Sequence, residues 1–269
     1  MANSLGNVQE IAQQTFVDGL ASSTEDYARC CEVLSYEGGT AQLMATNAGG
    51  LGTEVTSAST SVSASDLTSG ISSITQRAFV LKHSVPWAQL NWSLNLAADA
   101  GTQLANAAAQ NINKLFFDNL EGAFALNHPM AGAGAGQVGA GKHLIDTGLG
   151  FAQGTAVAGT QSNLLTAAFS EAALDSAKQV LRNYKNQQAL PMNMGAGSDM
   201  VLIVSPKNER VAAEVLTSAL SGADMQANTF RQYADLVVFP FSTDDDDWFL
   251  IDKSKSPVGI RWRFAPPDP

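Results

Sequence analysis

Cysteine is scarce in this sequence: there are only two, and they are adjacent, Cys30 and Cys31. Neighbouring cysteines rarely bond to each other because the bridge would be strained. A disulfide framework is therefore excluded. A structural zinc site is excluded too, because it needs four ligands at characteristic spacing. We interpret both cysteines as small, half-buried residues.

Long apolar runs are also missing. No stretch approaches the roughly 20 consecutive apolar residues of a membrane-spanning helix, so no membrane partner is predicted. The first residues, MANSL, contain no basic segment followed by an apolar one. We therefore expect no signal peptide and expect the protein to be made and kept in a cytoplasm.

Residue types that carry catalysis or bind metals form no convincing motif. The three histidines, His83, His128 and His143, lie far apart and beside no matching carboxylate or cysteine motif, so we interpret them as loop residues. No G-x-S-x-G elbow exists. Residues 244–247 are consecutive aspartates, which cannot all point at one calcium ion, so a solvated turn is the prediction and weak ion binding the alternative. We predict no catalytic residue, no cofactor and no metal site.

One glycine-rich stretch, from Gly136 to Lys142 (GQVGAGK), fits the G-x-x-x-x-G-K pattern of phosphate-binding loops. Such loops continue with Ser or Thr and follow a buried strand. Here His143 comes next, an alanine-glycine run precedes, and residues 147–150 (TGLG) interrupt any following helix. We interpret the stretch as a flexible loop. A nucleotide-binding enzyme built on Gly136–Lys142 is the alternative.

Basic residues are outnumbered, and the net charge is −10. Residues 1–75 hold eight acids and one base, so most of the excess lies there. A protein that grips nucleic acid by its phosphates needs a basic patch, and none is visible in the sequence. The 269 residues, 45% of them apolar, suit one large domain or two closely associated ones with a sizeable core.

The best-marked stretch is 163–252. Ser170 is predicted to cap a helix over 170–186, with Phe169 and Leu174 forming a hydrophobic staple. Residues 200–204 (MVLIV) predict a strand buried on both faces. Ser205 and Pro206 predict the start of a second helix, which Gly222 would close. Residues 236–239 and 248–252 predict two more strands around the acidic turn. The order is that of an α/β layer.

The remaining chain predicts further elements. Helical spacing covers residues 8–16 and again 27–34, whereas 53–75 hold 13 Ser or Thr among 23 residues, which predicts a linker or a loop ordered by a neighbour. Residues 78–81 and 90–94 predict strands, and an alanine-rich run over about 96–124 predicts a long helix. The tail, 259–264, alternates apolar and basic residues and predicts a strand that pairs near residues 78–94.

Three passages together resemble the C-terminal half of tailed-bacteriophage major capsid proteins, most closely the Mu-like major head subunit family. They are the capped helix 170–186 followed by QALPM (188–192); MVLIVSP (200–206) leading into 209–220; and DLVVFP (235–240), the turn 243–247 and WFLID (248–252).

This resemblance implies an α+β fold, the phage major capsid fold that encapsulins and herpesvirus capsids share. It implies the following division: an N-terminal arm (1–36), an extended loop (37–77), a peripheral domain with a spine helix (78–162), an α/β axial domain (163–238) and return strands (239–269). In relatives the arm reaches neighbouring subunits; an ordinary first helix packed on its own domain is the alternative. Residues 221–233 would lie nearest the local symmetry axis.

The implied function is that of a major head protein, not an enzyme. Copies would assemble as pentamers and hexamers into an icosahedral shell around double-stranded DNA, without sequence-specific binding, in the virion and after assembly in the host cytoplasm. No coiled-coil leader is visible, so a separate scaffolding protein is expected, with a portal and a decoration protein as further partners. An encapsulin-like shell around protein cargo is the alternative.

Overall fold

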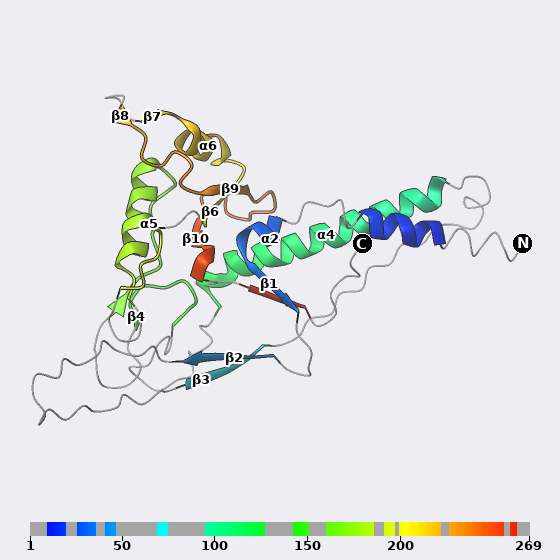
Figure 1. Ribbon diagram of the computed structural model, residues 1–269, viewed down its shortest axis with the longest axis horizontal. Helices are drawn as coiled ribbons and strands as arrows, with labels where there is room; N and C mark the ends of the chain where they lie inside the picture. The colour runs from blue at the N-terminus through cyan, green and yellow to red at the C-terminus, as the bar shows by residue number, and fades with distance from the viewer. Residues whose placement is uncertain are drawn as a thin grey trace, which may run out of the picture. The chain divides into compact units, whose positions relative to one another are not determined.

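A computed structural model describes a mixture of helices and strands, as an α+β fold requires. The described residues are 10–19, 26–35, 41–46, 69–74, 95–126, 142–150, 160–185, 191–196, 199–221, 226–255 and 259–262 (Figure 1). The chain forms two compact units. One combines residues 1–38, 76–119 and 258–269, and the other combines 39–75 and 120–257. The strands predicted at 78–81 and 90–94 lie outside the described residues.

The second unit contains a three-stranded sheet with β6 (Met200–Val204) in the centre. Strand β10 (Trp248–Asp252) pairs antiparallel on one side, and β9 (Asp235–Val238) pairs parallel on the other. Every residue of β6 is buried. This confirms the prediction from its continuous apolar run, because a strand covered on both faces has no solvent side for a polar residue.

Helix α5 (Glu171–Asn183) begins as predicted. The Ser170 hydroxyl accepts the backbone N–H of Ala173 at 3.1 Å, and Leu174 and Ala177 are buried. The helix ends three residues earlier than expected, because Tyr184 adopts an extended conformation (φ −66°, ψ 134°).

The predicted start and end of the second helix are wrong. Helix α6 spans Glu209–Thr217 with Asn208 at its N-cap position, so it does not begin after Ser205. Ser205 is instead buried, and its hydroxyl donates to the backbone carbonyl of Asp245. Beyond the helix, β7 (Leu220–Ser221) pairs antiparallel with β8 (Gln226–Ala227), so Leu220 does not extend the helical stripe.

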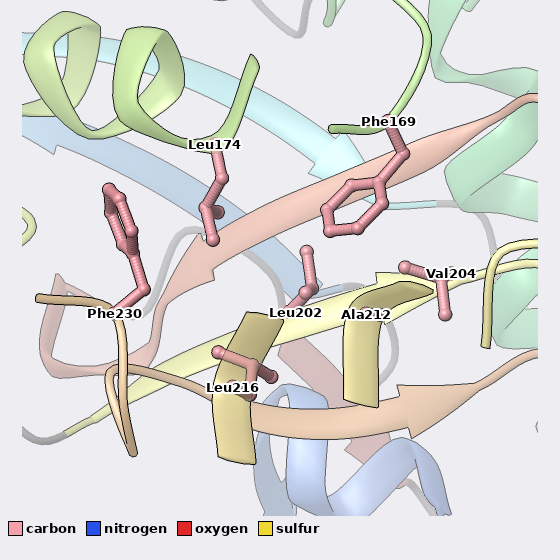
Figure 2. Packing of buried hydrophobic residues seen from close by; sticks show 7 residues of the cluster. All are labelled: Phe169, Leu174, Leu202, Val204, Ala212, Leu216 and Phe230. Carbon is pink, nitrogen blue, oxygen red and sulfur yellow. The ribbon is translucent and has the colours of Figure 1, made fainter. Parts of the chain in front are cut away.

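The core of this unit lies where α5 and α6 pack on the sheet. Figure 2 shows the cluster. It consists of Phe169, Leu174, Leu202, Val204, Ala212, Leu216 and Phe230. Phe169 and Leu174, the predicted staple pair, both belong to it. Burying a leucine or phenylalanine contributes about 1.5 to 3 kcal/mol, so this cluster is a main source of the unit's stability.

The long helix is confirmed: α4 spans Asn95–Glu121 and passes into a 3-10 turn, η1 (Gly122–Phe124). A helix over residues 10–19 and α2 (Asp26–Cys30) precede it in the chain. Leu34 was expected to continue the second helical pattern but lies in β1 (Glu32–Ser35). The tail strand β11 (Gly259–Trp262) pairs parallel with β1; its predicted partners near 78–94 lie outside the described residues.

The N-terminal helices run alongside α4 with a constant offset. A side chain on Gly101 would meet Thr15, one on Gly19 would meet Ala105, and the backbone N–H of Tyr27 donates to the side chain of Asn113. Each of these pairs is separated by 86 positions, so the segment and α4 advance together in parallel. In Figure 1 the dark blue helix over residues 10–19 accordingly lies beside the first turns of α4.

Smaller elements complete the description. Within the second unit, β2 (Ala41–Thr46) and β3 (Ser69–Ile74) form an antiparallel pair, with β3 at the carboxyl end of the Ser/Thr-rich stretch. Strands β4 (Leu149–Gly150) and β5 (Thr160–Gln161) form another, and η2 (Lys253–Lys255) follows β10. Among the described helices, none has both the length and the apolar character to span a bilayer.

Candidate functional site

The acidic turn lies at the carboxyl end of β6 and is held by hydrogen bonds to side chains of the turn and of the residues just after β6. The N–H of Asp246 donates to Asp244 Oδ1 at 2.9 Å, and the carbonyl of Asp245 accepts from the side chain of Asn208 at 3.2 Å as well as from Ser205. Lys207 Nζ donates to Asp246 Oδ1 at 2.7 Å. The predicted solvated turn is therefore a turn tied to the residues just after β6.

Charges in the turn perturb one another. Burial, followed by the nearby carboxylates of Asp244, Glu121 and Asp246, raises the pKa of Asp247. The hydrogen bond to Asp246 raises the pKa of Lys207. Among the described residues, no group of three or more His, Cys, Asp or Glu side chains is placed to hold a metal ion.

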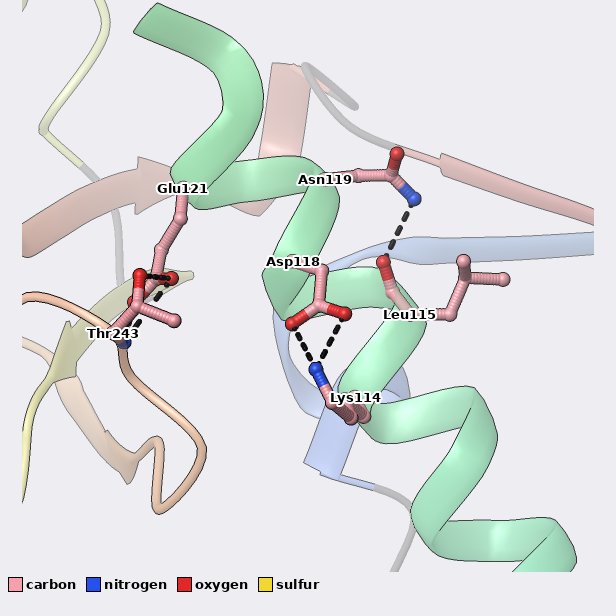
Figure 3. Close-up of polar contacts among 6 residues, drawn as sticks. All are labelled: Lys114, Leu115, Asp118, Asn119, Glu121 and Thr243. Atoms are coloured by element: carbon pink, nitrogen blue, oxygen red, sulfur yellow. Dashed lines mark hydrogen bonds and ion pairs between the residues drawn. The ribbon is translucent and has the colours of Figure 1, made fainter.

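Glu121, at the last residue of α4, clasps the loop that precedes this turn (Figure 3). Its carboxylate accepts the hydroxyl of Ser242 at 2.7 Å, the hydroxyl of Thr243 at 2.7 Å and the N–H of Thr243 at 3.0 Å. Next to it, the rings of Phe124 and Phe249 pack with centroids 5.9 Å apart. The end of α4 is therefore fastened to strand β10 and its turn.

At the opposite end of β6, a buried carboxylate organises the loop before the strand. Asp252, 3% exposed, accepts the N–H of Gly195 at 2.7 Å with one oxygen and the N–H of Ser254 with the other. Gly195 has φ of +68°, and a side chain there would meet Leu181 at 3.2 Å. A residue without a side chain is needed, because this conformation and this close approach both disfavour one.

The segment from Ala227 to Ala234 is held firmly at its base. The side-chain amide of Asn228 donates to the carbonyls of Val215 and Ser218 at 2.6 and 3.0 Å, and its oxygen accepts the N–H of Phe230 at 2.8 Å. The Asn228 side chain therefore caps the carboxyl end of α6, where backbone carbonyls lack helical partners.

Aromatic rings then join this segment to α5. Lys178 Nζ lies 5.0 Å from the centroid of Phe230 and 4.7 Å from that of Tyr233. The Tyr233 hydroxyl donates to the Gly195 carbonyl at 3.2 Å, and burial raises the pKa of Tyr233. Residues 222–225, within the loop expected near a symmetry axis, lie outside the described residues.

The glycine-rich stretch is described only at its end, since residues 136–141 lie outside the described part. Lys142 Nζ donates to the carbonyl of Thr147 at 2.9 Å and lies 3.9 Å from Asp146 Oδ1. The backbone N–H of His143 lowers the pKa of Asp146 most strongly. The Lys142 ammonium group thus binds a carbonyl of the loop that follows it, whereas the lysine of a phosphate-binding loop contacts the phosphates of the ligand.

The remaining candidate residues are the two cysteines and the three histidines. Cys30 and Cys31 are fully buried rather than half-buried, and the Cys31 thiol donates to the carbonyl of Tyr27 at 3.0 Å. His143 lies beside Lys142, with its Nδ1 buried and without a hydrogen-bond partner among the described residues. His83 and His128 lie outside the described residues.

Taken together, the polar side chains of the second unit tie loops and helix ends to one another. A model of a phage capsid protein family matches residues 88–267, about two thirds of the chain. The chain therefore belongs to this family of phage capsid proteins, structural proteins of the virion whose copies build a shell. No curated protein and no solved structure matches the chain.

The sequence analysis did not identify the residues whose side chains connect distant elements of the second unit. Glu121 belongs to the unremarkable end of a long helix, and Asn228 and Lys178 carry no motif. No local signal marked Asn228, because it lies 11 positions beyond Thr217, the last residue of α6.

Proposed function

We propose that this chain is a major head protein whose copies assemble as pentamers and hexamers into an icosahedral shell enclosing a double-stranded DNA genome. The observation that carries the proposal is the family match, which covers α4 and the whole α/β layer. The Mu-like head subunits are the proposed relatives within that family.

Each part has a proposed role. The layer of residues 163–238 surrounds the local symmetry axis, with 221–233 nearest to it, and α4 forms the spine of the peripheral part. The extended loop (37–77), which contains the hairpin β2–β3, and the N-terminal arm (1–36) contact neighbouring subunits. Two-stranded hairpins are marginal in water alone, which supports a neighbour as the hairpin's partner. Contacts of this head-to-tail kind can close into rings, and many weak contacts together stabilise the shell.

The net charge supports a shell that encloses DNA without binding its phosphates. With a net charge of −10, the protein repels the phosphates of a genome on average, so the DNA is enclosed without sequence-specific binding. A scaffolding protein, a portal and a decoration protein are the proposed partners, and assembly takes place in the host cytoplasm.

Electron microscopy of the purified protein, with light scattering on the same sample, tests the proposal. We expect hollow particles of uniform size, or rings of five and six subunits. A stable monomer or dimer at every concentration and salt tested, even with phage lysate added, would contradict assembly. If shells from infected cells contain a protein cargo and no nuclease-protected DNA, the encapsulin-like alternative replaces the genome-enclosing one.

A further inference from the structure

The fold gathers a basic surface that the sequence does not reveal. Lys178 lies against the rings of Phe230 and Tyr233, and the Arg182 charge lowers the pKa of Tyr233, partly offsetting the effect of burial. Arg231 is the next residue after Phe230, so its backbone lies near the ring that Lys178 contacts. We call Lys178, Arg182 and Arg231 the basic surface. Arg182 and Arg231 are exposed, and Lys178 is half-buried.

These three bases differ from others in the described part of the chain. Arg29, Lys114, Lys142, Lys207 and Arg210 each lie within 4.0 Å of a carboxylate. The bases of the basic surface form no ion pair among the described residues. Their charges are therefore left for a group outside the described chain.

The acidic turn lies at the other end of the same layer. At the carboxyl end of β6, Ser205 contacts Asp245 of the turn. At its amino end, Asp252 pairs with the first residue of β6 and accepts the N–H of Gly195. Gly195 lies against Leu181, the neighbour of Arg182 in α5. A five-residue strand is about 13 Å long. The Debye length is about 8 Å at physiological salt, so the two charged ends hardly neutralise each other within one copy.

Helix α5 runs from the acidic end of the layer to the basic end. Its first turn lies near the acidic turn, because Phe169 packs on Trp248 with ring centroids 5.4 Å apart. Its last turns carry Lys178 and Arg182. The Asp252 charge also acts on Tyr233, but this carboxylate is buried and accepts the N–H groups of Gly195 and Ser254. A layer with an acidic turn at one end and exposed bases at the other is complementary to a second copy of itself in a head-to-tail contact, the type of contact that closes into rings.

We infer that the basic surface, Lys178, Arg182 and Arg231, receives the acidic turn 244–247 of the neighbouring copy around a ring. This inference rests on the proposed function, since it names the contact through which copies of the layer meet. The contact is heterologous: each copy gives its turn to one neighbour and its basic surface to the other. It weakens as salt rises, because exposed charge pairs are screened.

An exchange of charges tests the contact. One variant carries Arg182→Glu and Arg231→Glu, a second carries Asp245→Lys and Asp246→Lys, and a third carries all four substitutions. Lys178 is left in place because it packs on aromatic rings, and Asp244 because its carboxylate accepts a hydrogen bond within the turn. Asp246→Lys also removes the exposed ion pair with Lys207, and thermal melting of the second variant measures that loss separately. Arg210→Glu, at an 82% exposed base of α6 paired with Glu214, is the matched control.

The readout is the lowest protein concentration at which particles form. We expect each two-residue variant to raise it about tenfold, and the four-residue exchange to restore it to within about threefold of wild type, because the attraction returns with opposite sign. Arg210→Glu should leave it unchanged. Circular dichroism and thermal melting establish that each variant is folded.

Three outcomes overturn the contact. Two-residue variants that assemble like wild type show that these charges do not meet. Folded two-residue variants that fail without rescue by the exchange show that another partner is involved. Arg182→Glu, Arg231→Glu particles that form normally but lose their nucleic acid show that the surface faces the genome. If wild type itself never assembles, the proposed function fails instead.

Discussion

The carboxylate of Glu121 accepts two hydrogen bonds from Thr243, from its N–H at 3.0 Å and its hydroxyl at 2.7 Å. The two residues are 122 positions apart, and Ser242 donates to the same carboxylate. Bonds to a charged acceptor are stronger than neutral ones. The end of the long helix is thus held at the loop that leads into the acidic turn.

Glu121→Ala should lower the free energy of unfolding by about 1 kcal/mol, because it removes the charged acceptor of three hydrogen bonds, although Thr243 can turn to water and Ser242 to the carbonyl of Asp244. Urea denaturation of the unassembled subunit measures this loss. Asp118→Asn is the matched control: its ion pair with Lys114, one turn earlier, is exposed and should contribute at most about 0.5 kcal/mol. Equal effects of the two substitutions would contradict the clasp.

Asn228→Asp should destabilise the protein at least as much as Asn228→Ala, although aspartate has nearly the same shape. The amide donates to the carbonyls of Val215 and Ser218, and a carboxylate would place a negative charge against both at a helix carboxyl end. We expect a loss of about 2 kcal/mol for alanine and more for aspartate at pH 7, measured by thermal melting. A milder effect of aspartate would contradict the donor role of this side chain.

Gly101→Ala should release the helix over residues 10–19. A side chain at position 101 would lie 2.6 Å from the carbonyl oxygen of Ala12 and closer still to the Thr15 hydroxyl. Alanine favours a helix over glycine by about 1 kcal/mol, but overpacking costs about 1 to 3 kcal/mol. Hydrogen exchange should become faster at residues 10–19 while α4 stays protected. Thr102→Ala, at the exposed neighbouring position, is the control and should leave both helices protected.

Asp247→Asn should stabilise the acidic turn near neutral pH. Burial and neighbouring carboxylates raise the pKa of Asp247 above its ordinary 3.8, so the folded state holds this proton more tightly than the unfolded state. In the wild type, the stabilisation from protonated Asp247 is complete below pH 3.8 and is lost as the pH rises through the raised pKa. Since Asp247 is only partly buried and solvent screens the repulsion, the gain at pH 7 should be on the order of 0.3 kcal/mol.

Urea denaturation of Asp247→Asn between pH 4 and 8 measures this difference, which should shrink towards the acid end. Asp245→Asn removes a charge from the same turn that does not contribute to the raised pKa, so its effect should be smaller. A gain independent of pH would show that the amide adds a hydrogen bond instead of relieving repulsion.

Local signals in the sequence determined much of the fold. The apolar run at 200–204 is β6, Ser170 caps α5, and the alanine-rich run is α4. Each depends on residues within one or two turns or on a strand's own pattern, so neighbouring residues suffice to decide it. The resemblance at residues 170–252 likewise pointed to the phage capsid family that the chain belongs to.

Only the tertiary structure decided which distant groups meet. Ser205 looked like a helix cap, but Asp245, 40 positions later, takes its hydroxyl and α6 begins at Glu209. The tail strand pairs with β1, and Glu121 finds Thr243. The opposite placement of acidic turn and basic surface depends on strand pairing and helix direction. Contacts between residues far apart in the chain depend on how packed elements share space, which no local pattern encodes.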